Sequence, residues 1–449
     1  MTIRIHFVGV KGTGMSALAQ ISAEMENAQI TGSDVAERFF TDVVLEKAGI
    51  HVLPFEASNV DNADLVVASA AYGKDHPEIS RAMELGIPVL SYPQYLGRLM
   101  AKRRGVCVTG THGKTTTTAM VSLILLEAEY DPSIVVGSDV PVLGGNAYAG
   151  KGEFFVAESC EYRRHFLNYQ PEFLVILNMD LDHPDYFRDL DDVVSAFQEL
   201  SAKVPPQGTV VVWGDDPNWM RIRPATPVIT YGLADHNTYR AQNISYEDGG
   251  SKFEVLHRGQ NLGFFKVGIT GKHNVLNALA ALALTRSMGV SVEVIRASLA
   301  KFSGTKRRFE KLGEYNGAVI MDDYAHHPTE INATLAGARQ AFPSRRIVAV
   351  FQPHTFTRTE KLLDEFAACF SHADEVIVAD IFASARESGG SSVNAATLAE
   401  KIRANGVEAR FLADFQAIKG YLAECLGKDH LVLTLGAGDI YKVGLDLVD

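Results

Sequence analysis

Short apolar runs alternate with segments of helical length along almost the whole chain. In its first hundred residues, apolar runs predict strands at 3–10, 28–31, 52–54, 64–70 and 89–91. Continuous runs of this kind are typical of parallel strands, which are buried on both faces. Because helical segments such as Met15–Met25 and Tyr92–Lys102 separate the runs, we expect an α/β fold with parallel sheets.

The alternation continues in two further units. From residue 102, apolar runs predict strands at 106–108, 153–157, 173–178 and 209–212, followed by antiparallel strands within 239–267. Later in the chain, strands are predicted at 318–321, 346–351, 375–379, 409–412 and 431–435. The polar, glycine-containing stretch Ser303–Arg308 is typical of a linker. We therefore expect three domains, with boundaries 1–101, 102–305 and 306–449.

Composition narrows the class of protein. The 449 residues are 47% hydrophobic, yet no apolar run approaches the roughly 20 residues of a membrane-spanning helix, so we expect no membrane insertion. The chain enters a strand soon after Met1, which predicts no signal peptide. A net charge of −12 argues against a nucleic-acid partner. The cysteines are widely separated and are most simply reduced thiols. We expect a cytoplasmic multidomain enzyme.

The most informative segment is 110–115, Gly-Thr-His-Gly-Lys-Thr, between a predicted strand and a predicted helix. In such a turn, free backbone N–H groups and the positive end of the helix dipole bind phosphate. Lys114 adds a positive charge at the phosphates, and the Thr115 hydroxyl is placed to hold Mg²⁺. Val108 stands where the standard phosphate loop has its first glycine, so the loop is a variant. It predicts that the chain uses a nucleoside triphosphate.

A second glycine turn, Gly9-Val-Lys-Gly12-Thr-Gly14-Met15, follows the first predicted strand. Its glycines permit a tight turn and the close approach of the backbone to a pyrophosphate. Asp34 follows about 20 residues later, where dinucleotide sites place a ribose ligand. The spacing departs from Gly-x-Gly-x-x-Gly. The turn alone therefore leaves three interpretations: a site for a dinucleotide cofactor, a site for another diphosphate ligand, and a purely structural turn.

Polar clusters follow several predicted strands, at the edge of a parallel sheet where ligands collect. Glu158 offers a hard oxygen ligand for a metal, and His183 offers a nitrogen, which suits Mg²⁺ less well. In isolation, a pair such as Asp182–His183 is more often a capping or core pair than a metal ligand, and Asn274 is equally an N-cap. The other candidates are either binding groups or solvated and helix-capping residues: His273, Asn277, Arg307, Arg308, Asp322, Asp323, His326, His327, His354 and Arg358.

Together these segments resemble the Mur ligase family. The resemblance is carried, in chain order, by 110–118, 157–167, 178–185, 271–278, 304–309, 322–330 and 352–359. Residues 6–16 and Gly-Ser-Asp at 32–34 resemble the alanine-adding type in particular. The family has a Rossmann-like N-terminal domain for a UDP-sugar, a central P-loop ATPase-like domain and a Rossmann-like C-terminal domain. The resemblance implies the same three domains here.

The resemblance also implies an activity. ATP phosphorylates the lactyl carboxylate of UDP-N-acetylmuramate, and L-alanine attacks the acyl phosphate to give a peptidoglycan precursor. The first glycine turn is then a UDP-sugar site instead of a dinucleotide site, with Asp34 near the uridine. The residues implied for that site are Gly9, Gly12, Thr13, Gly14, Met15, Asp34 and Ser69.

The resemblance also implies roles for three sets of residues at positions that match the family. Lys114 is expected to hold the transferring phosphate, Thr115 and Glu158 to bind one Mg²⁺, and His183 to bind a second. The resemblance implies an ATP site made of Gly110, Thr111, His112, Gly113, Lys114, Thr115, Thr116, His273, Asn277, Arg308 and Asp323. His354 and Arg358 are expected to position alanine or the acyl phosphate.

The chain departs from the family pattern at several positions. Phe197 and Gln198 stand where some members carry a modified metal-bridging lysine, so none is predicted here. Thr355 stands where some relatives have arginine, which leaves Arg358 as the anion contact. The alternatives are a sister ligase that attaches a preformed peptide in wall recycling, a nicotinamide-dependent dehydrogenase and an ATP-switched scaffold. We expect a monomer or a weak homodimer.

Overall fold

The computed structural model describes residues 2–247, 249–383 and 393–448. The chain divides into two compact units. The first comprises Met1–Met179, Val193–Thr238 and Ala280–Ser298, and the second comprises Asp180–Asp192, Tyr239–Leu279 and Leu299–Asp449.

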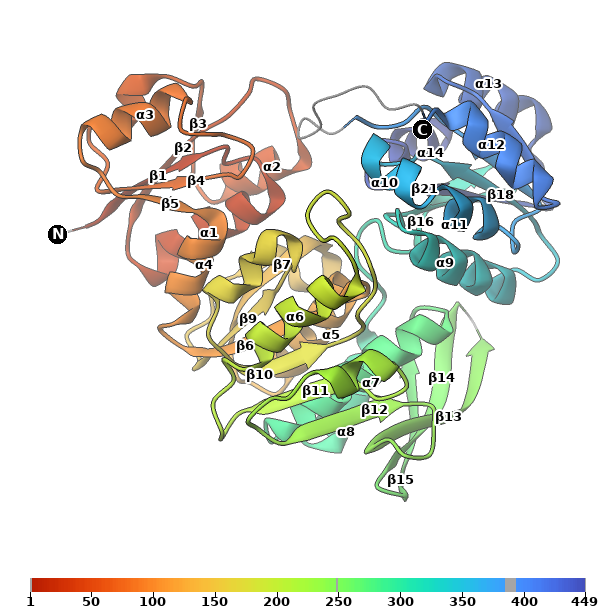
Figure 1. Cartoon of the computed structure of the whole chain (residues 1–449), viewed down its shortest axis with the longest axis horizontal. Helices are drawn as coiled ribbons and strands as arrows, with labels where there is room; N and C mark the ends of the chain where they lie inside the picture. The colour runs from red at the N-terminus through yellow and green to blue at the C-terminus, as the bar shows by residue number, and fades with distance from the viewer. Residues whose placement is uncertain (1, 248, 384–392, 449) are drawn as a thin grey trace. The chain divides into compact units, whose positions relative to one another are not determined.

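The N-terminal part of the first unit is built on a five-stranded parallel sheet (Figure 1). Its order is β3-β2-β1-β4-β5, with bounds β1 Arg4–Val8, β2 Gln29–Ser33, β3 Val52–Leu53, β4 Leu65–Ala68 and β5 Val89–Ser91. Its helices are α1 Thr13–Met25, α2 Phe40–Lys47, α3 Pro77–Glu84 and α4 Tyr92–Met100. The strand order reverses between β1 and β4, and sheets of this kind bind ligands at such a switch point. The glycine turn follows β1 and therefore lies there.

A second sheet of the first unit runs in the order β12-β11-β10-β6-β9-β7-β8. Its bounds are β6 Arg104–Thr109, β7 Ser133–Val140, β8 Gly145–Tyr148, β9 Phe154–Glu158, β10 Pro171–Ile176, β11 Thr209–Trp213 and β12 Val228–Gly232. Only the β7–β8 pair is antiparallel among these described pairings. The phosphate loop follows β6, an interior strand. It leads into α5 (Lys114–Glu127), whose residues 115–125 are buried, so the sheet and the helix core hold the loop from both ends.

The second unit contains an antiparallel meander and a six-stranded sheet. The meander consists of β13 Tyr239–Glu247, β14 Gly250–His257 and β15 Gln260–Val267. The six-stranded sheet has the order β16-β17-β21-β18-β19-β20 and is parallel except for β16 with β17. Its bounds are β16 Glu310–Tyr315, β17 Ala318–Asp323, β18 Arg346–Phe351, β19 Glu375–Val378, β20 Glu408–Phe411 and β21 His430–Leu435.

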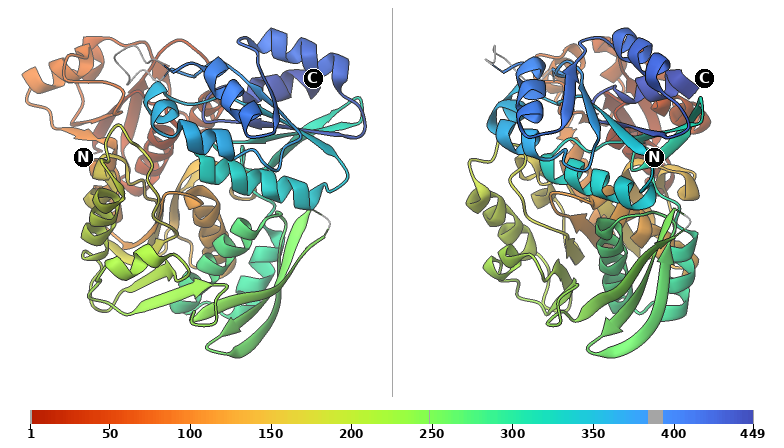
Figure 2. Two further views of the ribbon diagram at one scale, coloured as in Figure 1. Left: turned by 45° about the vertical axis from the view of Figure 1, so that its right-hand side comes forward. Right: turned by 90° about the vertical axis from the view of Figure 1, so that its right-hand side faces the viewer.

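Strand β18 shows why the interior C-terminal strands contain apolar runs. Ile347, Ala349 and Phe351 enter one core, which α9, α11 and α12 share. Val348 and Val350 enter a second core, which α13 and α14 share. Helices thus cover both faces of the sheet (Figure 2), and after the exposed first residue, Arg346, every position of the strand is buried. These helices are α9 Pro328–Ala341, α10 Phe356–Lys361, α11 Leu363–Ala368, α12 Ala395–Ala404, α13 Phe415–Cys425 and α14 Tyr441–Val448.

The predicted α/β class with three sheet domains is confirmed. Strands β7, β8, β12 and β16 were not predicted. β16 reads Glu-Lys-Leu-Gly-Glu-Tyr and lies at a sheet edge, where an apolar run is not required.

The other helices are α6 Leu190–Ser201, α7 Lys272–Ser287 and α8 Val292–Lys301. Among the residues that the structure describes, no helix has the length and apolarity to cross a membrane.

Candidate active site

The phosphate loop contains two glycines in backbone conformations that other residues rarely adopt. φ is +132° at Gly110 and +84° at Gly113. A Cβ at Gly110 would lie only 2.9 Å from the Cβ of Leu177. The side chain of Asn178 accepts a hydrogen bond from the backbone N of His112 at 2.8 Å and donates one to its carbonyl at 3.0 Å. The carboxyl end of β10 therefore holds the loop in shape.

The ammonium of Lys114 folds back onto its own loop. Its Nζ donates to the carbonyl oxygens of Gly110 at 2.6 Å and Thr111 at 2.8 Å, and lies 3.1 Å from Oε2 of Glu161. Burial alone would lower the pKa of Lys114, but the carboxylates of Glu161 and Glu158 raise it above its ordinary value. The loop therefore contains a fixed positive charge.

Thr115 and Glu158 meet where α5 begins and β9 ends. The Thr115 hydroxyl donates to Oε1 of Glu158 at 3.0 Å, and Oε2 accepts from the backbone N of Gly137 at 2.7 Å. A hydroxyl and a carboxylate are hard oxygen donors, the kind that Mg²⁺ prefers. The pair fits a magnesium site next to the lysine.

The glycine turn of the N-terminal domain is tied to the end of β2. The backbone N of Gly9 donates to the carbonyl of Ser33 at 2.9 Å, and that of Lys11 donates to Oδ2 of Asp34 at 2.7 Å. The other oxygen of Asp34 accepts from the backbone N of Val35 at 2.8 Å. Asp34 therefore stabilises the turn itself, in addition to the ligand-binding role that the sequence predicts.

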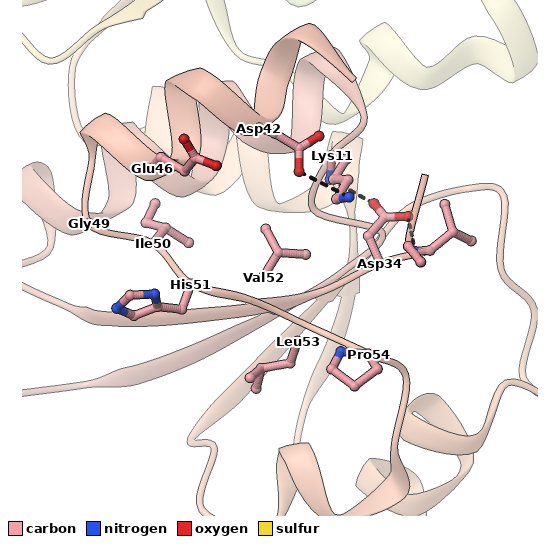
Figure 3. A pocket seen from close by; sticks show the side chains of 12 residues that line it. Lys11, Asp34, Asp42, Glu46, Gly49, Ile50, His51, Val52, Leu53 and Pro54 are labelled. Carbon is pink, nitrogen blue, oxygen red and sulfur yellow. Dashed lines mark hydrogen bonds and ion pairs between the residues drawn. The ribbon is translucent and has the colours of Figure 1, made fainter. Parts of the chain in front are cut away.

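A cavity of about 500 Å³ lies beside Asp34 (Figure 3). Val52 and Leu53 contribute apolar walls, whereas Lys11, Asp34 and Asp42 contribute charged groups. The ammonium of Lys11 lies 3.0 Å from Oδ1 of Asp42. An apolar cavity of this size with a few fixed polar groups suits a small ring-containing ligand such as a nucleoside.

In the second unit, Arg358 of α10 forms a buried ion pair with Asp182. Nε and Nη2 of Arg358 lie 3.0 and 2.7 Å from Oδ1 of Asp182. Burial alone would raise the pKa of Asp182, but its electrostatic interactions with His183 and the Arg358 guanidinium hold it well below its usual range. The backbone N of His183, at φ +54°, also donates to Asp182. Nearby, the ring of His354 stacks on Phe382 with centroids 5.4 Å apart.

The first two turns of α7 contain His273, Asn274 and Asn277. The helix begins at Lys272, so Asn274 is not its N-cap. Its amide donates instead to the carbonyl of Thr270 at 2.8 Å and accepts from Asn277 at 3.3 Å. Burial lowers the pKa of His273 to about 4, so the ring is neutral at pH 7.

Asp323 ends β17 beside Arg308. Its carboxylate accepts from the backbone N of Phe309 at 2.8 Å and of Ala325 at 2.7 Å. Burial raises the pKa of Asp323 to about 6, and the charge of Arg308 opposes the shift. The Arg308 guanidinium lies 5.1 Å from the ring centroid of Tyr324. A polar cluster is therefore present at the carboxyl end of this strand, as the sequence predicts.

The predicted residues form separate clusters within each unit. The first unit brings Lys114, Thr115 and Glu158 together, and also holds the glycine turn, Asp34 and Ser69. The second unit contains His183, His273, Asn277, Arg308, Asp323, His354 and Arg358.

Comparison with known proteins identifies the family. Residues 4–104 match the Mur ligase family catalytic domain, residues 108–285 the Mur ligase middle domain, and residues 307–438 the Mur ligase glutamate ligase domain. The chain belongs to the Mur ligase family.

Individual relatives cover this Mur ligase from end to end. It is 60% identical over 448 residues to the UDP-N-acetylmuramate–L-alanine ligase of Desulfitobacterium hafniense (strain Y51), with 100% of both chains covered. The crystal structure of the UDP-N-acetylmuramate–alanine ligase of Thermotoga maritima matches with a TM-score of 0.84 and 30% identity, over 99% of this chain and 98% of that one. The murein peptide ligase of Psychrobacter arcticus 273-4 matches with a TM-score of 0.72 and 25% identity, over 99% and 98%.

Two polar groups of this Mur ligase were not singled out from the sequence: Asn178 holds the phosphate loop, and Glu161 pairs with Lys114. The sequence singled out Asp182, but not its pairing with Arg358. All three lie within segments that carry the family resemblance. Spacing along the chain identifies such segments, but it does not reveal which side chain faces which partner.

Proposed function

We propose that this Mur ligase joins L-alanine to the lactyl carboxylate of UDP-N-acetylmuramate, with ATP and Mg²⁺, during peptidoglycan precursor synthesis in the cytoplasm. Family membership makes it an ATP-dependent ligase. The observation that carries the proposal is the cluster of Lys114, Thr115 and Glu158 at the phosphate loop. Similarity along the full length to ligases of the alanine-adding type supports the choice of substrates.

The chemistry explains why ATP is needed. A carboxylate resists attack by an amine because its charge repels the nucleophile and oxide is a poor leaving group. A lactyl oxygen therefore attacks the γ-phosphorus, the bond to ADP breaks, and an acyl phosphate forms. The amine of L-alanine attacks the acyl carbon, inorganic phosphate leaves and the nitrogen loses its proton to solvent. Negative charge builds on the phosphoryl oxygens, where preorganised positive groups accelerate the reaction.

We assign the triphosphate to the loop 110–116. Its backbone N–H groups and the start of α5 bind phosphate oxygens, and the ammonium of Lys114 faces the transferring group. Thr115 and Glu158 are assigned as ligands of one Mg²⁺. The ion, when bound, offsets charge on the phosphates.

We assign the UDP-sugar to the N-terminal domain. The diphosphate lies on the glycine turn and the N-terminus of α1, with contacts from Gly9, Gly12, Thr13, Gly14 and Met15. Asp34 and the cavity beside it take the uridine, and Ser69, just past the end of β4, contacts the ligand. The reversal of strand order between β1 and β4 supports this placement.

We assign the remaining roles to residues of the second unit. His183 is assigned to a second metal ion, and ATP contacts are assigned to His273, Asn277, Arg308 and Asp323. His354 and Arg358 position the amino acid or the acyl phosphate. We propose functional domains at 1–101 for the UDP-sugar, 102–305 for ATP and 306–449 for ligation, in a monomer or weak homodimer.

Release of ADP tests the proposal. With Mg²⁺, ATP and UDP-N-acetylmuramate, we expect ADP to form at a sustained rate only when L-alanine is added. Activity with a tripeptide but not with L-alanine would favour the sister ligase, the second candidate, which the similarity to a murein peptide ligase supports. Saturable NADH binding at low concentration, with no ADP release, would favour the dehydrogenase.

A further inference from the structure

Two tyrosine rings pack against the glycines of the N-terminal turn. A Cβ at Gly9 would lie 2.7 Å from Cε2 of Tyr72. A Cβ at Gly14 would lie 2.7 Å from Cε2, 2.8 Å from Cζ and 3.0 Å from the hydroxyl of Tyr92. Gly14 does not have a positive φ, so the ring of Tyr92 is what requires a glycine there.

Tyr92 is held in this place by the start of α4. Ser91 caps the helix and forms a capping box with Gln94. One turn later, the hydroxyl of Tyr95 donates to Oγ of Ser22 in α1 at 2.9 Å. Helix α4 thus contacts α1 directly, the helix that the glycine turn begins.

The hydroxyl of Tyr92 lies beside Gly14, in the first turn of α1. Within the described part of the chain, this hydroxyl makes no hydrogen bond to another protein group. Burial raises the pKa of Tyr92, and the nearby charge of Glu158 raises it further. The group therefore stays protonated near neutral pH and can donate a hydrogen bond. The hydroxyl lies close to Gly14, and Glu158 is near enough for its charge to raise the pKa of Tyr92.

We propose that Tyr92 is a substrate-binding residue whose hydroxyl donates a hydrogen bond to the diphosphate of the sugar nucleotide at the N-terminus of α1. The inference rests on the proposed function. The first N–H groups of α1 and its dipole favour an anion at this position. A hydroxyl fixed beside Gly14 adds a donor to the same anion, and hydrogen bonds to charged acceptors are among the stronger ones.

Calorimetry with UDP, UDP-N-acetylmuramate and ATP tests the assignment. Tyr92→Phe keeps the ring over Gly14 and removes only the hydroxyl. We expect it to weaken UDP and UDP-N-acetylmuramate about tenfold each and to leave ATP affinity unchanged. Tyr95→Phe is the matched control, because it removes a hydroxyl from the same helix that bonds only Ser22. It should leave both uridine ligands unaffected.

The outcomes separate this inference from the proposed function. Unchanged UDP affinity in Tyr92→Phe would overturn it, as would an equal loss in Tyr95→Phe, which would reveal a packing effect of α4. The KM for UDP-N-acetylmuramate should rise while kcat changes little. If the unmodified chain binds ATP but not UDP, the UDP-sugar site itself is wrong and the inference is lost with it.

Discussion

Lys114 and Glu161 form an ion pair beneath the phosphate loop, with Nζ 3.1 Å from Oε2 and side-chain exposures of only 14% and 2%. Glu161 follows β9, whereas Lys114 begins α5, so the pair joins two segments that meet at the candidate site. In a buried pair, the loss of either partner leaves an uncompensated charge. The carboxylate therefore determines where the ammonium lies.

This pair predicts strong coupling in unfolding experiments. Glu161→Leu and Lys114→Met should each lower the free energy of unfolding by about 3 kcal/mol, and the double variant by clearly less than their sum. Urea denaturation of the four proteins measures the coupling. The exposed pair Lys311–Glu314 is the control, since Lys311→Met should cost less than about 1 kcal/mol. Additive losses at Lys114 and Glu161 would contradict the prediction.

Lys114→Ala should abolish ligation while sparing the sugar-nucleotide site. Removing the positive charge at the transferring phosphate should lower kcat about 10³-fold. UDP affinity should be unchanged, because the glycine turn is a separate part of the fold. ADP release and UDP calorimetry measure the two effects. Lys102→Ala should behave like the unmodified enzyme, and appreciable turnover in Lys114→Ala would remove the basis for the phosphate-loop assignment.

Gly9 and Gly12 should differ sharply in their tolerance of alanine. Gly9 has φ +78°, and its added Cβ would meet Tyr72, whereas the nearest atom to a Cβ at Gly12 is 3.6 Å away. Gly9→Ala should destabilise the protein by about 2 kcal/mol and weaken UDP binding. Gly12→Ala should cost less than about 1 kcal/mol. Thermal unfolding and UDP calorimetry of both variants check this, and equal losses would argue against the observed turn.

His273 should make the protein acid-sensitive. Its pKa is about 4 in the folded chain against an ordinary 6.5, so the unfolded chain binds the proton more readily. Its contribution to stability is therefore complete above pH 6.5 and falls as the pH drops towards 4, by about 3 kcal/mol. His273→Gln should remove this part of the acid destabilisation. Proton NMR of the ring should show no titration above pH 5, and a midpoint near 6.5 would refute the burial argument.

Glu78 should be the most sensitive acidic residue of α3. It is fully buried, accepts hydrogen bonds from Ser33 at 2.5 Å and Asn59 at 2.7 Å, and lies 3.5 Å from Nε2 of His6. Glu78→Ala removes a buried acceptor from each of these partners and should cost about 3 kcal/mol. Glu84→Ala, an exposed change on the same helix, should cost less than about 0.5 kcal/mol. Urea unfolding distinguishes the two variants. Similar midpoints would show that the buried hydrogen bonds of Glu78 do not stabilise the protein as expected.

Local patterns were sufficient for the fold class and for the phosphate loop. Parallel strands covered on both faces must be apolar at every position, as in Ile347–Phe351 of β18, so their runs are visible in the sequence. The loop at 110–115 combines its glycines, its lysine and its threonine within one turn. Its phosphate-binding groups belong to the same short segment and could be recognised without knowing the rest of the chain.

Only the tertiary structure decided which distant groups meet. Glu161 pairs with Lys114 across 47 residues, Arg358 pairs with Asp182 across 176 residues, and the ring of Tyr92 lies on Gly14. Such contacts depend on strand order and helix packing, which are determined by burial and hydrogen bonding summed over the whole domain. No periodicity or motif encodes that sum, so the sequence alone identified the candidate site segments but not the partners of their side chains.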